Sequence, residues 1–142
     1  MREADILRQL NHDNIVKFVR MIESETRVFL VMELSSGGQL QEYIKERYQN
    51  GNPLNDEEAS TIMRCIFSAV TNIHSKDIIH RDLKPSNVLV AMYDDRAVPK
   101  VIDFGVAKAT GQRLTEATLF TGFGDVIGTP EYMSPEQAEL NQ

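Results

Sequence analysis

Four side chains in the middle of this 142-residue sequence could act on a phosphate group. They are Asp82, Lys84, Asn87 and Asp103, which lie on loops next to apolar, strand-like runs. Carboxylate and amide oxygens are the ligands that Mg²⁺ prefers, and a lysine supplies positive charge beside a phosphate. A second carboxylate can accept the proton of an attacking hydroxyl. The group therefore has the residue types needed to hold a metal-bound phosphate beside an incoming hydroxyl.

The order of these residues resembles that of a known family. The string His-Arg-Asp-Leu-Lys-Pro-Ser-Asn at 80–87 is similar to the catalytic loop of protein kinases, and Asp-Phe-Gly at 103–105 is similar to their metal-binding motif. Gly-Thr-Pro-Glu-Tyr-Met-Ser-Pro-Glu at 128–136 is similar to the end of their activation segment. A single loop aspartate is usually a turn or cap residue. A full string in register, followed by the second motif, indicates the kinase family instead.

The resemblance implies roles for the chemically capable residues. The parent domain would transfer the γ-phosphate of ATP to a Ser or Thr hydroxyl of a protein substrate, with Mg²⁺ as the metal. Asp82 would be the catalytic base, and Lys84 would lie beside the transferring phosphate. Asn87 and Asp103 would bind Mg²⁺. Thr129 should hydrogen-bond near Asp82 and Lys84 and help to select Ser or Thr. Lysine at position 84 is the form typical of serine/threonine kinases.

The same resemblance implies a nucleotide site. Met32 would be the gatekeeper, although it can serve as core filler at the same time. The Glu33 carbonyl and the Ser35 amide would contact the adenine, and Leu89 would form the floor beneath it. Gln39 lies where many relatives carry an acid that binds the ribose, and its amide can still hydrogen-bond.

Regulatory residues are implied as well. Glu3 matches the glutamate of the family's regulatory helix, and its alternative role is a solvated acid in a first helical turn. Arg81 would hold a phosphate on the activation segment. The acceptor candidates for that phosphate, each of which could instead be merely solvated, are Thr115, Thr118 and Thr121. Phe104 would pack and orient Asp103. The apolar column that links the two lobes of an active kinase is matched by Leu7, Phe18, His80 and Phe104.

Apolar periodicity predicts the elements that position these residues. Helices are expected over 1–10, over 40–48, and from a cap at Asn55 or Asp56 to about 75; hairpins are expected over 15–22 with 27–34 and over 88–92 with 98–102. The long helix should face the core with Ala59, Ile62, Met63, Ile66, Ala69, Val70 and Ile73. The expected fold is α+β and kinase-like: a partial small lobe over 1–34, a hinge over 35–38 and a partial, mainly helical large lobe over 39–142.

Composition narrows the possible partners. The net charge of −6, without a basic block, argues against a nucleic-acid partner. No apolar run approaches the length of a membrane span, and the charged start is unlike a secretory signal. The lone Cys65 cannot form an internal disulfide, so a reducing, cytoplasmic setting is expected.

The resemblance covers only the middle of the kinase domain. The glycine-rich loop and the ATP-binding lysine would precede Met1, and later helices would follow Gln142. We therefore expect an unpaired apolar edge at 28–31 and self-association of the isolated chain. A catalytically inactive, kinase-derived binding module is the alternative function, because the phosphate-binding lysine is absent. A small-molecule phosphotransferase is disfavoured, because Lys-Pro-Ser at 84–86 is a protein-kinase form.

Overall fold

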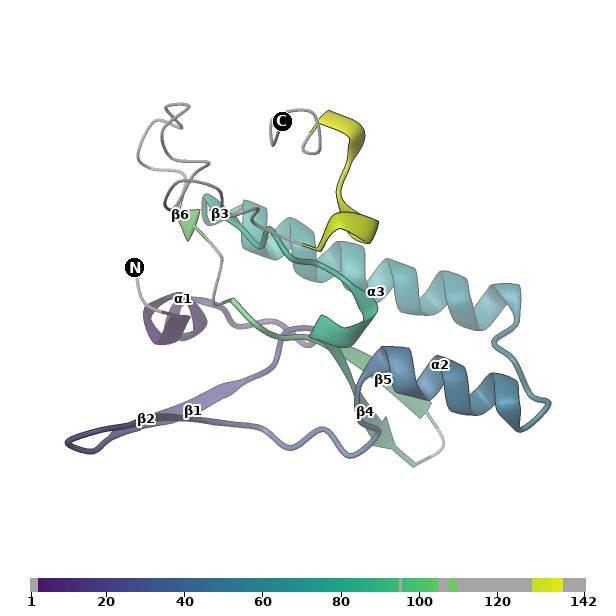
Figure 1. Ribbon diagram of the computed structural model, residues 1–142, viewed down its shortest axis with the longest axis horizontal. Coiled ribbons are helices and arrows are strands. Elements are labelled where there is room, and N and C mark those ends of the chain that lie inside the picture. The colour runs from purple at the N-terminus through teal and green to yellow at the C-terminus, as the bar shows by residue number, and fades with distance from the viewer. Residues whose placement is uncertain (1–2, 95, 105–107, 110–128, 137–142) are drawn as a thin grey trace.

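Helices and small antiparallel strand pairs make up the computed structural model, which describes residues 3–94, 96–104, 108–109 and 129–136 (Figure 1). The helical elements are α1 (Glu3–Gln9), α2 (Leu40–Gln49), α3 (Asp56–His74) and the 3-10 turns η1 (Pro85–Asn87) and η3 (Pro130–Tyr132). The strands are β1 (Phe18–Glu23), β2 (Val28–Met32), β3 (Ile78–Ile79), β4 (Val88–Tyr93), β5 (Arg96–Val101) and β6 (Lys108–Ala109). Within the described residues β1 pairs with β2, β3 with β6 and β4 with β5. The mixture confirms the expected α+β class.

The first hairpin is shorter than its apolar pattern predicts, because its first residues join another strand. Ile15 forms a parallel bridge with Val101 of β5, and the Val16 amide donates to the Val101 carbonyl at 3.0 Å. The paired strands begin only at Phe18, where the register with β2 is irregular. In Figure 1 the β1–β2 hairpin extends away from the remaining elements, to the lower left. Residues 15 and 16 therefore attach this hairpin to β5.

The start of α3 is decided by a capping box. The Asn55 side chain accepts a hydrogen bond from the Glu58 amide at 2.9 Å, and the Glu58 carboxylate accepts one from the Asn55 amide at 2.9 Å. Asn55 is therefore the cap, and Asp56 is the first helical residue. Arg47 of α2 donates two hydrogen bonds to the same Glu58 carboxylate, at 3.0 and 3.1 Å, which ties the two helices together.

Among the described helices, none is both long and apolar enough to cross a bilayer.

The core lies between α3 and the strands. α3 packs against β3 and β5, and α2 packs against β4 and η1. The buried residues of α3 are Ile62, Ile66, Ala69 and Ile73. Met63, which was expected to face the core with them, is 45% exposed, so that prediction was wrong. Its side chain lines an open apolar groove between α2 and α3, together with Ile44 and Leu83.

The β4–β5 hairpin brings the two ends of the chemical motif together. Its register runs from Tyr93 paired with Arg96 to Val88 paired with Val101, so Arg96 belongs to the strand and not to the turn. Beyond the last pair, the Ile102 amide donates to the Asn87 carbonyl at 3.0 Å. Asp103 is the next residue. The hairpin therefore delivers Asp103 to the neighbourhood of Asn87, as expected.

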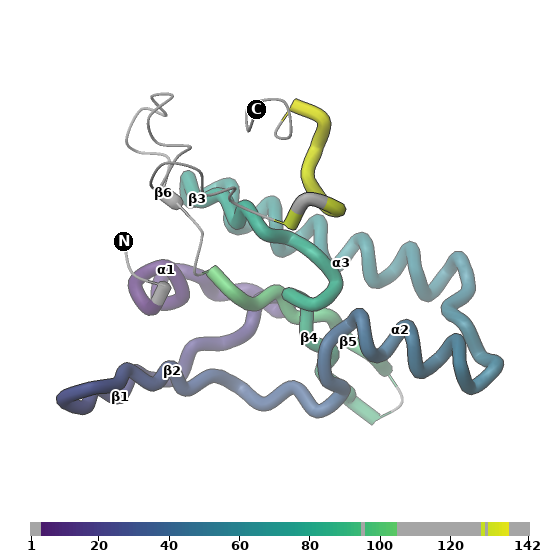
Figure 2. The backbone as a smooth tube through the Cα atoms, in the orientation of Figure 1, coloured from purple at the N-terminus to yellow at the C-terminus, as the bar shows by residue number. Residues whose placement is uncertain are grey.

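The connection from β2 to α2 is held against β4. Figure 2 follows this stretch along the lower edge of the molecule. The Gly37 amide donates to the Val90 carbonyl and the Val90 amide to the Gly38 carbonyl, each at 2.8 Å. A Cβ atom at position 37 would lie 2.8 Å from the Val90 carbonyl oxygen, so only glycine permits this approach.

Candidate active site

Asp82 is the centre of a connected polar cluster. The Thr129 hydroxyl donates to its Oδ1 at 2.7 Å, and Asn87 Nδ2 donates to its Oδ2 at 2.9 Å. Lys84 Nζ lies 3.1 Å from the same Oδ2 and donates to the Thr129 hydroxyl oxygen at 2.6 Å. The structure thus brings together Asp82, Lys84 and Thr129, as the sequence predicted, across more than 40 positions of the chain.

Local geometry explains why Asn87 reaches back to Asp82. Pro85 occupies the start of η1, where its fixed φ suits a helical turn. The turn closes when the Asn87 amide donates to the Lys84 carbonyl at 2.9 Å. Asn87 Nδ2 then donates to the Asp82 backbone carbonyl at 2.8 Å as well as to its carboxylate. Both hydrogens of this amide are therefore used to hold the loop around Asp82.

The hydrogen bonds decide the charge of Asp82. Burial of the carboxyl group acts to raise its pKa. The donors Thr129, Lys84 and Asn87 favour the ionised form and outweigh burial, so the pKa of Asp82 lies below its ordinary value. Asp82 is therefore a carboxylate at neutral pH, ready to accept a further hydrogen bond.

His80 supports Asp82 from inside the core. Burial lowers the pKa of His80, although the Ile102 carbonyl and the charges of Asp103 and Asp82 act to raise it. The neutral ring can donate from Nε2 to the Ile102 carbonyl at 2.8 Å and accept at Nδ1 from the Asp82 amide at 3.3 Å. Its ring packs on Phe104, with 5.0 Å between centroids. His80 thus packs against Phe104 and positions the backbone of Asp82.

Phe104 is almost fully buried, whereas the adjacent Asp103 is exposed and has a left-handed φ of 64°. Burial of Phe104 fixes the backbone that presents the Asp103 carboxylate to solvent. Leu7 belongs to the same buried cluster as Phe104, and Phe18 packs against it. The apolar column expected from the sequence therefore lies within one core.

The oxygen atoms at Asn87 and Asp103 fit a hard cation. Because Asn87 uses Nδ2 to hold Asp82, its Oδ1 is the side-chain atom left to serve as a ligand. The structure shows no cluster of three or more His, Cys, Asp or Glu side chains that could hold a metal within its described residues. Mg²⁺ suits such a sparse site, since it usually binds one or two protein side chains and keeps water and phosphate oxygens as its other ligands.

The residues expected at the nucleotide follow one another along the connection and β4. Met32 ends β2 and is partly exposed. Gln39 and Leu89 form an isolated antiparallel bridge, which places them side by side. The Ser35 hydroxyl is buried and has no hydrogen-bond partner among the described residues.

Lys100 was not predicted from the sequence. It is a buried lysine whose Nζ lies 3.0 Å from Glu33 Oε1. The only sign of it in the sequence is a charged residue inside an apolar strand.

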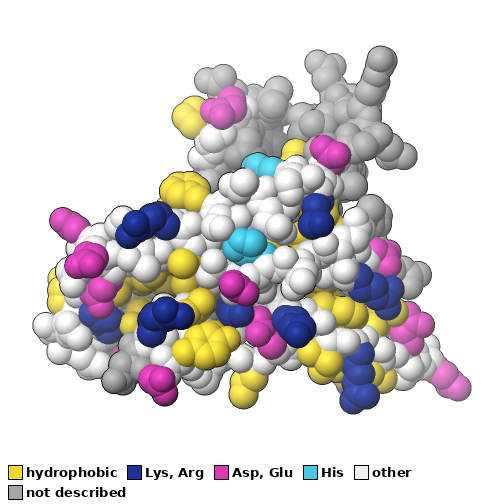
Figure 3. Space-filling view, turned by 180° about the vertical axis from the view of Figure 1, so that it is seen from behind, with side chains coloured by type: hydrophobic (Ala, Val, Ile, Leu, Met, Phe, Trp, Pro, Cys, Tyr) yellow, Lys and Arg dark blue, Asp and Glu magenta, His cyan; other side chains and the backbone are white. Residues whose placement is uncertain are grey.

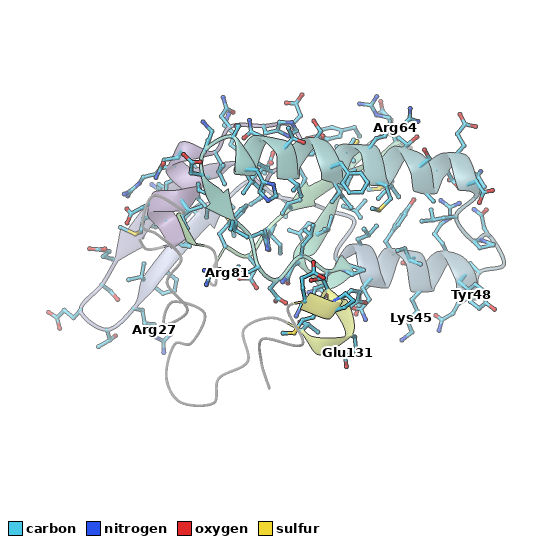
Figure 4. All side chains as sticks on the ribbon, turned by 90° about the horizontal axis from the view of Figure 1, so that it is seen from above. Arg27, Lys45, Tyr48, Arg64, Arg81 and Glu131 are labelled. Carbon is cyan, nitrogen blue, oxygen red and sulfur yellow. The ribbon has the colours of Figure 1, made fainter. Side chains whose placement is uncertain are left out.

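Arg81 adopts a left-handed backbone, with φ of 72°. Its Nη2 is buried and lacks a partner within the described part of the chain, and burial lowers its pKa. Figure 4 shows Arg81 well apart from Lys45 and Tyr48, which lie at the outer end of α2. The Glu3 side chain and the candidate phosphate acceptors lie outside the described residues; those acceptors are Thr115, Thr118 and Thr121.

A comparison with protein families decides the assignment. The protein kinase domain model matches residues 1–142. The chain belongs to the protein kinase family. Curated relatives of this kinase chain include Myosin light chain kinase A of Dictyostelium discoideum, 35% identical over 94% of the chain, and Probable serine/threonine-protein kinase PknB of Lactococcus lactis, 44% identical over 96%. Serine/threonine-protein kinase PrkC of Bacillus subtilis is 40% identical over 96%. The chain spans 42%, 20% and 19% of these three relatives.

Proposed function

We propose that the protein containing this chain is a serine/threonine protein kinase, which transfers the γ-phosphate of ATP to a Ser or Thr hydroxyl of a protein. The observation that carries the proposal is the Asp82 cluster, in which Lys84, Asn87 and Thr129 hold one ionised carboxylate. The names of the relatives support the substrate class, since they include several serine/threonine-protein kinases.

The cluster leaves room for a substrate hydroxyl. A carboxylate has about four acceptor positions, two on each oxygen. Asp82 Oδ2 is used by Asn87 and Lys84, whereas Oδ1 accepts only from Thr129 among the described residues. A substrate hydroxyl can therefore donate to Oδ1. Because the pKa of Asp82 is low, the proton moves to it late, when the phosphoryl group is already being transferred.

Lys84 has one hydrogen left for the phosphate. Its ammonium group carries three N–H donors, and two of them are directed at Thr129 and Asp82. The remaining donor can bind an oxygen of the transferring phosphoryl group. Asn87 Oδ1 and the Asp103 carboxylate would hold Mg²⁺, which neutralises the phosphate charge that builds up during transfer. The protein thus contributes position and charge, which are the main requirements of this reaction.

The remaining residue roles belong to the same proposal. ATP would lie against the hinge, with contacts to Met32, Glu33, Ser35, Gln39 and Leu89. Arg81, whose Nη2 has no partner among the described residues, would bind a phosphate on Thr115, Thr118 or Thr121. Glu3 would belong to the regulatory helix, in a partial small lobe over 1–34 that a hinge over 35–38 joins to a partial large lobe over 39–142.

The proposal also covers the cellular compartment, nucleic-acid binding and self-association of the protein. The free thiol of Cys65 suits a reducing compartment such as the cytoplasm. The net charge of −6 argues against a nucleic-acid partner. Self-association is proposed because the β1–β2 hairpin exposes apolar side chains, which Figure 3 shows at the right, next to charged groups. The exposed residues are Val19, Ile22, Val28 and Phe29.

The test is phosphate transfer by the full-length protein that contains this chain, with Mg²⁺ and ATP, to a Ser/Thr peptide and to an aminoglycoside. We expect the peptide to be labelled and Asp82→Asn to lose about 10²- to 10⁴-fold of the rate, the usual contribution of a general base. Asp56→Asn, an exposed acid on α3, is the matched control and should keep the activity. Transfer to the aminoglycoside alone would overturn the substrate class. Binding of ATP without any transfer would support the inactive binding module instead.

A further inference from the structure

Lys100 is a buried charge that the proposed reaction does not use. It lies on β5 and only 6% of it is exposed. A buried ammonium group is costly unless it is paired and hydrogen-bonded. Its partner is Glu33, whose Oε1 lies 3.0 Å from Lys100 Nζ. Glu33 directly follows β2, so this ion pair joins the second hairpin of the chain to the end of the first.

The Glu33 carboxylate is held from a second direction. The Lys17 amide donates to Glu33 Oε1 at 2.9 Å. In the main chain, the Glu33 amide donates to the Lys17 carbonyl, also at 2.9 Å. The Glu33 side chain, just after β2, is thus bonded to the residue before β1 and to the penultimate residue of β5.

The segment before β1 is fixed to the same strand. Asn14 Nδ2 donates to the Pro99 carbonyl at 3.1 Å, and the Val101 amide donates to the Asn14 carbonyl at 2.9 Å. We call the assembly of residues 14–17, Glu33 and 99–101 the hinge junction. It is the place where the β1–β2 hairpin is attached to the strand that leads to Asp103.

We propose that Lys100 is a positioning residue that fixes the hinge for nucleotide binding, an inference that rests on the proposed kinase function. The Glu33 carbonyl and the Ser35 amide, the expected adenine contacts, have no backbone hydrogen bond to any described residue. Their backbone is clamped on both sides, by Lys100 at Glu33 and by the Gly37 bond to Val90. Without the ion pair between Lys100 and Glu33, the hinge backbone must become ordered when ATP binds. The entropy lost in that ordering weakens ATP binding.

The ion pair offers a way to separate positioning from stability. Glu33→Gln leaves the Lys100 charge buried without its counter-charge, which is strongly destabilising. Lys100→Met removes the charge and keeps an apolar side chain of similar length. The double variant combines Glu33→Gln with Lys100→Met. Both charges are gone in it, so its thermal stability should return towards that of the wild type. The ion pair that holds Glu33 to β5 is absent in both Lys100→Met and the double variant.

The experiment measures ATP KM, kcat, melting temperature and hydrogen exchange of residues 33–35 in the full-length protein. We expect Lys100→Met and the double variant to raise ATP KM about tenfold, which corresponds to about 1.4 kcal/mol, with kcat within about twofold of the wild type. Exchange at residues 33–35 should accelerate in both variants. Lys45→Met, an exposed lysine on α2, is the matched control and should change none of these quantities.

The other possible outcomes would contradict the positioning role, the clamp on the hinge or the proposed function. An unchanged or lowered KM in the double variant would overturn the positioning role, as would a lowered kcat at unchanged KM. Unchanged exchange at residues 33–35 would overturn the clamp itself, whether or not the protein is active. A wild-type protein that transfers no phosphate would overturn the proposed function, and the exchange data would still decide whether Lys100 fixes the hinge.

Discussion

Replacement of Thr129 by valine is the sharpest test of the cluster around Asp82. The change removes one hydroxyl group and nearly conserves the shape of the side chain. Two contacts are lost, the 2.7 Å bond to Asp82 Oδ1 and the 2.6 Å bond from Lys84 Nζ. A hydrogen bond to a charged group contributes about 1.5 to 3 kcal/mol. Loss of one such bond in the transition state lowers kcat/KM by a factor of about 10 to 150.

The same substitution should change the pH dependence of activity. The Thr129 bond is one cause of the low pKa of Asp82, so its loss raises that pKa. In the proposed reaction the ionised carboxylate is the active form, so activity should fall as the pH drops through its pKa. The acid limb of the kcat/KM profile should therefore move to higher pH in Thr129→Val, and Thr129→Ser, which keeps the hydroxyl, should restore it. Wild-type kcat/KM with an unmoved acid limb in Thr129→Val would refute the reasoning.

Two further predictions concern stability and association. Because burial lowers the pKa of His80, the unfolded chain is protonated at this histidine at a higher pH than the folded chain. The contribution of His80 to the free energy of unfolding should therefore be constant above about pH 6.5 and fall below it. Denaturant unfolding at several pH values should show a smaller loss in His80→Gln than in the wild type, and the exposed His74→Gln serves as the control; an equal loss in all three would contradict this. The isolated 142-residue chain should elute as an oligomer or aggregate in size-exclusion chromatography, and Val28→Lys with Phe29→Lys should shift it towards the monomer, since both residues are about half-exposed. A sharp monomer peak for the wild-type chain would refute the proposed self-association.

The cluster around Asp82 could be predicted because its members lie in short strings with fixed internal spacing. Local geometry then determines most of the contacts, as in the turn that returns Asn87 to Asp82. Thr129 is distant in sequence, and only the resemblance to a kinase activation segment connected it to Asp82. The structure shows that contact directly, at 2.7 Å.

Other features could not be read from the sequence because they depend on partners in space. The apolar run that begins at Ile15 indicates a strand but does not say which strand it joins, and here the partner of Ile15 is Val101. Helical spacing places Met63 near the apolar face of α3 without saying whether anything covers it. Lys100 and Glu33 are far apart in the chain, so their charges gave no sign of a buried pair.

During synthesis, the hinge junction can form only after β5 has been made, long after the β1–β2 hairpin. Asn14 and Pro99 are separated by 85 positions, and closing such a loop costs roughly 4 kcal/mol of chain entropy. The β1–β2 hairpin ends at Met32 and β5 at Val101. Ribosomes add about 5 to 20 residues per second, so the hairpin is made roughly 3 to 14 seconds before β5 is complete. A lone two-stranded hairpin is at best marginally stable in water. During that interval the apolar side chains of β1 and β2 are available to chaperones and to neighbouring nascent chains, and a slower codon stretch before residue 99 would lengthen their exposure.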